Sequence, residues 1–147
     1  MVPTNSIESF PDEILLEIFS YCSVEDLALS IQHVNKRWKE VSQDPKLWKD
    51  LVFRPAKGMN DEWIRNVVEQ APLLRCLVLS HEIDAPLLVD SLCKGCTDMK
   101  KLQFSSSQKL ATTVLQKLRR KFPDIECLVL AVHQKYNLTY RLPPTIN

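Results

Sequence analysis

The sequence predicts an α+β protein that leans towards α, in which an N-terminal helical module precedes a short array of alternating strands and helices. Helix-start signals crowd residues 1–50, and apolar residues recur at a nearly constant interval after them. Hydrophobic residues make up 45% of the 147 residues, which is enough to bury a core. We expect a helical module at residues 1–50, the strand–helix array at residues 51–132, and a C-terminal cap or tail at residues 133–147.

The composition disfavours several classes of function. A net charge of +1 gives no general attraction to nucleic acid or to anionic lipid, so we expect neither partner. Residues 1–9 lack the pattern of a secretory signal, and no apolar run approaches the roughly 20 residues of a membrane span. Five cysteines, an odd and scattered set, indicate reduced thiols in a cytoplasmic or nuclear protein.

The first helix is predicted over residues 12–22. Pro11 stands near its start, where the missing N–H costs nothing, and Ser9 and Asp12 have the spacing of a weak helix-start box. Its apolar side chains cover roughly 220° of the helix surface, against the ~100° of an ordinary surface helix. They are Ile14, Leu15, Leu16, Ile18, Phe19, Tyr21 and Cys22. Such a helix must be covered from two directions.

Three further short helices are predicted before residue 50. A start box at Ser23-Val24-Glu25-Asp26 begins a helix that reaches Ile31. The next helix covers residues 33–42, and a last short turn leads from Asp44 to Trp48. Helices this short cannot bury all their large side chains among themselves. The surplus apolar surface must face either the rest of the chain or another protein.

The pattern of proline, apolar clusters and two tryptophans in these helices resembles an F-box. The residues that carry the resemblance are FPDEILLEIFSY at 10–21, VNKRW at 34–38 and DPKLW at 44–48. An F-box docks a substrate receptor onto the Skp-type adaptor of a cullin–RING ubiquitin ligase. Phe10 stands where leucine is usual and Asn35 where cysteine is common; Phe10 is still bulky and apolar, so we expect docking to survive.

The resemblance also implies which residues meet the adaptor. Positions at or near the interface are Phe10, Pro11, Ile14, Leu15 and Ile18. The further apolar positions Val34, Trp38 and Trp48 divide between the core and the interface. The alternative is that these side chains are only the core of a small helical domain.

The second signal is a repeat. An L-x-x-L-x-L arrangement occurs four times, with central residues spaced 26, 25 and 26 apart, at Leu51, Leu77, Leu102 and Leu128. This period is typical of leucine-rich repeats, in which each unit buries its face against its neighbours. Helical segments that begin near Asp61, Asp84 and Leu110 separate the strands. Residues 51–132 therefore resemble a short leucine-rich-repeat array, and Trp48 belongs to both parts, which argues against a flexible linker.

The predicted strands also present a candidate substrate-binding face. Its residues lie beside the central leucines, about 4.8 Å apart from strand to strand. They are Val52, Val78, Gln103 and Val129. The alternative is that the C-terminal tail covers this row. Alternation from Tyr136 to Leu142 predicts a last strand, compatible with a cap and with an irregular tail.

Cys93-Lys94-Gly95-Cys96 is the one motif that suggests chemistry. A redox C-x-x-C usually sits at a helix start, whereas this one falls near a predicted helix end, where the helix dipole disfavours a thiolate. No second cysteine pair or paired histidines complete a zinc site. We expect a structural role for the motif, with no metal and no cofactor.

These observations favour a non-catalytic substrate receptor of an SCF-type ubiquitin ligase. It would bind a Skp-type adaptor, and through it a cullin–RING ligase, and present an unknown protein target. Partner enzymes would supply the chemistry, and the receptor would supply proximity. A truncated array that regulates or competes for the adaptor is the alternative. A thiol oxidoreductase that uses Cys93 and Cys96 is a remote one.

Overall fold

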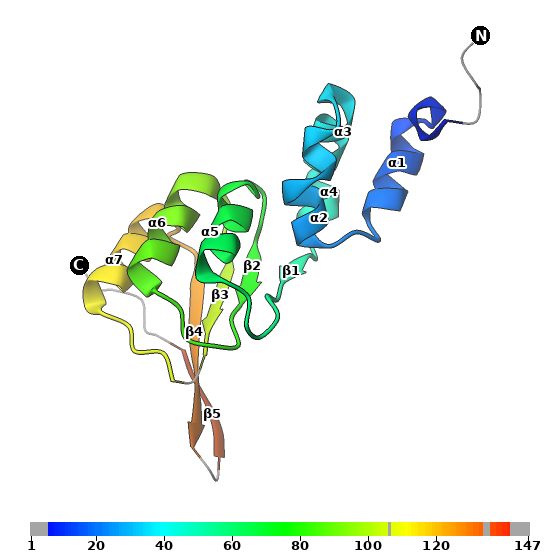
Figure 1. Cartoon of the computed structure of the whole chain (residues 1–147). Coiled ribbons are helices and arrows are strands. Elements are labelled where there is room, and N and C mark those ends of the chain that lie inside the picture. The colour runs from blue at the N-terminus through cyan, green and yellow to red at the C-terminus, as the bar shows by residue number, and fades with distance from the viewer. Residues whose placement is uncertain (1–5, 106, 134–135, 142–147) are drawn as a thin grey trace.

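The computed structural model describes the backbone of residues 6–105, 107–133 and 136–141, and the side chains within this set up to Cys127. Helices form the N-terminal part, and the rest is a small, mostly parallel sheet with helices along one face (Figure 1). The α+β class with a helical N-terminal part is therefore confirmed. Within the described residues, no helix has the length and apolar character needed to cross a membrane.

Short helices follow one another through the N-terminal part. They are η1 (Ile7–Ser9), α1 (Asp12–Phe19), α2 (Val24–Leu29), η2 (Ile31–His33), α3 (Lys36–Ser42) and α4 (Pro45–Trp48). The predicted starts at Ser23 and Asp44 are confirmed, because these side chains accept hydrogen bonds from the amides of Asp26 (3.1 Å) and Lys46 (2.9 Å). The third helix starts later than predicted, because Asn35 caps it by accepting from the Trp38 amide at 2.8 Å.

Helix α1 differs from its prediction at both ends. It ends at Phe19 rather than residue 22, because the following amides bond three residues back and tighten the chain into a turn. The Ser9–Asp12 start box does not form. Pro11 occupies the N-cap position without a side-chain hydrogen bond, and the Ser9 hydroxyl donates to the Ser6 carbonyl.

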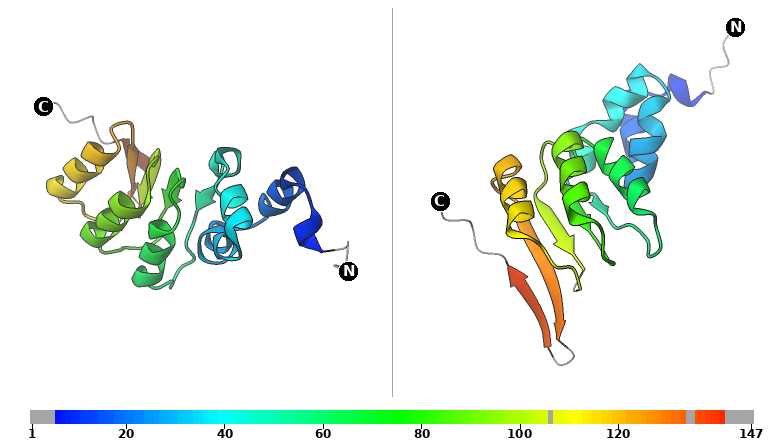
Figure 2. Two further views of the ribbon diagram at one scale, coloured as in Figure 1. Left: turned by 90° about the horizontal axis from the view of Figure 1, so that it is seen from above. Right: turned by 60° about the vertical axis from the view of Figure 1, so that its left-hand side comes forward.

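The five strands lie in the sheet in chain order. They are β1 (Val52–Phe53), β2 (Cys76–Val78), β3 (Lys101–Phe104), β4 (Glu126–His133) and β5 (Tyr136–Arg141). The first four are parallel, and β5 pairs antiparallel with β4 at the edge. Helices α5 (Asp61–Glu69), α6 (Ala85–Gly95) and α7 (Thr112–Lys121) lie side by side over one face of the sheet (Figure 2). This layering puts the core between the sheet and the three helices.

The register corrects the predicted central residues of the strands. Phe53, Leu77, Leu102 and Cys127 are partners in one row, and all four are buried beneath the helices. Their spacing is 24, 25 and 25 residues. The choices of Leu51 and Leu128 were therefore wrong. Leu51 precedes β1, and Leu128 pairs with Gln103 in the next row.

The predicted substrate face is also only partly in register. Val78 and Gln103 are partners, as expected. Val52 pairs instead with Cys76, so it lies two residues away from the row of Val78. Val129 pairs with Phe104, and its side chain lies outside the described residues. A slip of one or two residues in a strand follows from choosing the wrong leucine as its centre.

The predicted last strand is confirmed as β5, which extends the sheet beside β4. Leu142, the final residue of the predicted alternation, lies outside the described residues. The alternative in which the C-terminal tail, residues 133–147, covers the open face finds no support in residues 136–141, which form β5 at the edge of the sheet. Residues 142–147 lie outside the described residues.

The helical part and the sheet are packed on each other. Buried Gln32 in η2 donates from Nε2 to the carbonyls of Ala28 (2.5 Å) and Gln70 (2.7 Å), which joins α2 to the end of α5. His33 Nε2 lies 2.8 Å from Gln70 Oε1. Trp48 is buried and donates to the Ser42 carbonyl at 2.6 Å. One continuous apolar core runs from α1 through the sheet.

Candidate protein-docking site

Helix α1 carries two adjacent apolar stripes with different surroundings. Leu15 and Phe19 are fully buried in the core of the protein. Pro11, Ile14 and Ile18 share a neighbouring face, roughly 60–120° around the helix axis from the middle of the Leu15–Phe19 stripe. Pro11 is exposed, Ile14 keeps 41% of its surface exposed, and Ile18 is half-buried. The rest of the described chain therefore covers the Leu15–Phe19 stripe of α1 and leaves the neighbouring stripe partly exposed to solvent.

Exposed apolar side chains are concentrated in this part of the molecule. Eight large hydrophobic residues within the described residues are exposed, and five of them precede residue 35. Those five are Ile7, Phe10, Ile14, Tyr21 and Val34. Phe10 is 41% and Val34 53% exposed. Clusters of exposed apolar side chains are typical of protein-interaction surfaces.

Arg37 fixes the segment that enters α1. Its Nε bonds to Asp12 Oδ1 at 2.8 Å, and its Nη1 donates to the Glu8 carbonyl at 2.8 Å. Its Nη2 donates to the Phe10 carbonyl. The guanidinium therefore holds the backbone on both sides of Phe10 and Pro11. Sequence reasoning missed the role of Arg37. Any residue can supply a backbone carbonyl, so the sequence around Glu8 and Phe10 does not show that a guanidinium binds there.

Two of the predicted interface residues belong to the interior. Leu15 has no exposed surface and Trp48 only 3%. A partner cannot touch Leu15 in this conformation, so its prediction is corrected: it supports the surface from beneath. Of the three residues expected to divide between the core and the interface, Trp48 belongs to the core.

Trp38 lies between the core and the surface. It is half-buried and packs edge-on against Phe19, with ring centroids 5.2 Å apart. Its indole Nε1 is buried and has no hydrogen-bond acceptor among the described residues. An unpaired buried donor carries an energetic cost of about 1–3 kcal/mol.

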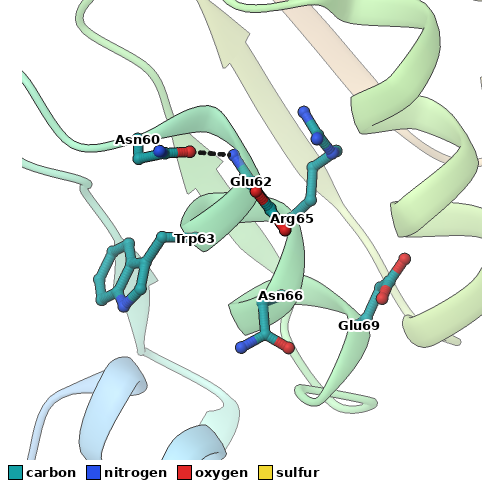
Figure 3. Close-up of a pocket in the computed structure, with 6 residues that line it drawn as sticks. All are labelled: Asn60, Glu62, Trp63, Arg65, Asn66 and Glu69. Atoms are coloured by element: carbon teal, nitrogen blue, oxygen red, sulfur yellow. Dashed lines mark hydrogen bonds between the residues drawn. The ribbon is translucent and has the colours of Figure 1, made fainter.

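A groove of about 520 Å³ runs along the outer side of α5 (Figure 3). Several of the polar groups in it serve the fold. Asn60 caps the helix by accepting from the Glu62 amide at 2.7 Å, and Asn66 accepts from Gln70 at 2.8 Å. Trp63 packs edge-on against Phe53 at 6.1 Å. Asn60, Asn66 and Trp63 of this groove are therefore used in the fold.

The C-x-x-C motif is a structural turn at the end of α6. Burial raises the pKa of the Cys96 thiol to about 12, and burial also raises the pKa of Cys93. Cys96 Sγ donates to the carbonyls of Val68 (3.3 Å) and Ala71 (3.4 Å), which are near the end of α5. A redox pair needs the opposite shift, towards the thiolate. The environment of the motif therefore gives the thiol oxidoreductase hypothesis no support.

Within the described residues, no group of three or more histidine, cysteine, aspartate or glutamate side chains is placed to hold a metal ion.

Comparison with known proteins locates a family in the N-terminal part. A model of the F-box-like family matches residues 7–54, which run from η1 to just past β1. F-box DNA helicase 1 of Gallus gallus is 44% identical over 55 residues, which is 36% of this chain. The match covers 5% of that relative, so the helicase in its name describes the relative alone. The exposed stripe of α1 and the Arg37 clamp thus lie within the matched segment, and residues 7–54 are an F-box-like domain.

Proposed function

We propose that the chain is a substrate receptor of an SCF-type cullin–RING ubiquitin ligase. An F-box domain suggests an adaptor role in such ligases, because F-box domains bind Skp-type adaptors. F-box proteins are also generally non-catalytic subunits of the ligase. The observation that carries the proposal is the exposed stripe on α1, which the rest of the described chain leaves uncovered.

In this proposal the adaptor covers the side chains that the chain leaves open. Phe10, Pro11, Ile14, Ile18 and Val34 make direct contact, and Trp38 contributes an edge. The surface that remains exposed on Phe10, Ile14 and Val34 adds up to about 1.4 whole side chains. Docking would bury this surface. At about 1.5–3 kcal/mol for each full burial, covering them contributes about 2–4 kcal/mol. Apolar burial at these three positions is thus a substantial part of a specific association.

Residues 51–132 would present the target. We interpret them as a leucine-rich-repeat-like array, supported by four parallel strands in chain order at intervals of 24, 25 and 25 residues. Helices α5, α6 and α7 cover one face, which leaves the other face for a target. The receptor would act in the cytoplasm or nucleus by raising the target's effective concentration near the partner enzymes.

The first test is the change Ile14→Asp. It places an unpaired carboxylate in an apolar interface, which costs several kcal/mol on docking and less in the free chain, where 41% of the Ile14 surface is exposed. We expect at least a hundredfold weaker binding to a purified Skp-type adaptor in a titration. Leu87→Asp is the matched control, because Leu87 is similarly exposed (46%) but lies on α6. Unchanged adaptor binding by Ile14→Asp would refute the proposal.

A second arm separates a receptor from a regulator. Cells that carry the intact chain or Ile14→Asp are compared by mass spectrometry of ubiquitin remnants. A receptor raises ubiquitylation of at least one bound protein, and the effect disappears in Ile14→Asp. Adaptor binding without any such protein would favour the alternative of a non-degradative competitor.

A further inference from the structure

The sheet has a face that none of the described helices covers. Helices α5–α7 lie on the opposite face (Figure 2). By register, one row of the open face consists of Val52, Cys76, Lys101 and Glu126. Val52 is exposed, and the other three are half-buried. The next row includes Val78 and Gln103.

Two cations on this face lack acidic partners. Arg54 and Lys101 both lie near Cys76, because each lowers the pKa of that thiol against the larger effect of burial, which raises it. Neither forms an ion pair within the described part of the chain. Their neighbours differ: Arg75 and Lys100 are both paired with Asp98 at 3.0 Å. Arg54 and Lys101 therefore keep their charges outside any ion pair of the described residues, although Glu126 is the cross-strand neighbour of Lys101.

Arg54 and Lys101 come from the two strands that flank β2, on which Cys76 lies. Arg54 directly follows β1 and continues into the row of Val78, whereas Lys101 lies on β3 in the row of Cys76. Two strand spacings and an offset of two residues put their backbones about 12 Å apart. Arginine and lysine side chains are long enough to bridge such a span, and both cations are close enough to Cys76 to lower the pKa of its thiol. Val52 and Val78 supply apolar surface beside them. The combination fits one acidic side chain flanked by apolar ones.

We propose that the open sheet face binds an extended target segment whose aspartate or glutamate carboxylate lies between Arg54 and Lys101, above Cys76. This inference rests on the proposed function and adds a class of target to it.

The test uses the full chain bound to a Skp-type adaptor. The probes are fluorescent extended peptides with one central glutamate among varied apolar residues, and twins that carry glutamine instead. We expect anisotropy to show about tenfold weaker binding for the glutamine twins, and the same loss for Lys101→Gln with the glutamate peptides. Lys100→Gln is the matched control, since it removes the same charge one residue away, and we expect less than a twofold effect.

Two further readouts make the assignment specific. A bound glutamate peptide should slow alkylation of Cys76 but not of Cys93, which is half-buried on α6. The charge exchange Lys101→Glu should restore binding when the peptide carries lysine in place of glutamate. Both readouts locate the ligand independently of any loss of stability.

The proposal is overturned if no glutamate peptide binds, if the twins bind equally, or if Lys100→Gln weakens binding as much as Lys101→Gln. Tighter binding of a phosphoserine peptide would overturn the choice of a carboxylate. In each case adaptor binding by Lys101→Gln shows whether the proposed function still stands, because that residue lies outside residues 7–54.

Discussion

Replacing Gly95 by alanine tests the close approach of α5 and α6. A Cβ at position 95 would lie 2.3 Å from the Cα of Glu69 and 2.6 Å from the carbonyl oxygen of Val68. These are backbone atoms, so no side-chain rotation relieves the overlap, and the two helices must separate. Separation also weakens the hydrogen bond from Cys96 Sγ to the Val68 carbonyl of α5.

The expected cost follows from two opposing effects. Overpacking a well-packed interior costs about 1–3 kcal/mol, and contacts with backbone place this site at the upper end. Alanine is favoured over glycine in a helix by about 1 kcal/mol. We therefore expect Gly95→Ala to lower the free energy of unfolding by about 2 kcal/mol, measured by urea denaturation followed by circular dichroism.

Gly58 provides a matched control for the same substitution. Its φ is 85°, but an added Cβ meets nothing within 4 Å, so Gly58→Ala costs only the conformational strain of about 1–2 kcal/mol. Asparagine tolerates this conformation and should recover part of the loss at Gly58, whereas Gly95→Asn should be worse than Gly95→Ala. A Gly95→Ala chain as stable as the parent, or more stable, would refute the close packing of α5 and α6.

Two further predictions concern the clamp and the buried thiol. Arg37→Ala should weaken adaptor binding about three- to tenfold in calorimetric titrations by freeing the segment around Phe10, while Lys39→Ala should not; equal effects would contradict the clamp. The Cys96 thiol has a folded pKa of about 12 against 9.0 for a free thiol, so the folded state holds its proton more tightly between these values. Stability should therefore fall as pH rises above about 9, by up to about 1.4 kcal/mol per pH unit from this group. Urea titrations across this range should show a smaller decline for Cys96→Ala, and an equal decline would contradict the assignment.

Local signals predicted several helix starts, because a cap depends on a few adjacent residues, but the Ser9–Asp12 box does not form. Ser23, Asp44 and Asp84 each accept an amide hydrogen bond, and the last does so from Leu87 at 3.1 Å. Asn35 departs from the F-box pattern, yet its side chain caps α3. Helix ends were harder: residues 20–22 are compatible with a helix, and only the three-residue hydrogen bonds end α1.

The repeat pattern could not fix the strand register, because more than one residue in a strand fits the repeat. Leu51 and Phe53 are two residues apart, so both have the same strand phase and both satisfy the repeat. Their burial decides between them, since Phe53 is in the core and Leu51 is only half-buried. In β4 the inward residue is the small Cys127, which hydrophobicity alone does not favour over Leu128. Leu15 and Ile14 present the same difficulty on α1, because both fall inside one wide apolar arc.

The join between the F-box-like domain and the sheet bears on how the proposed receptor would work. Gln32 is 8% exposed and bonds to a carbonyl on each side of the join. A swing of one part against the other would leave those groups unpaired, at about 1–3 kcal/mol each. The proposed docking stripe and the proposed target face are thus carried by one body. The distance from adaptor to target is then set by packing rather than by a flexible linker, so a target's lysines are sampled over a restricted volume at high effective concentration.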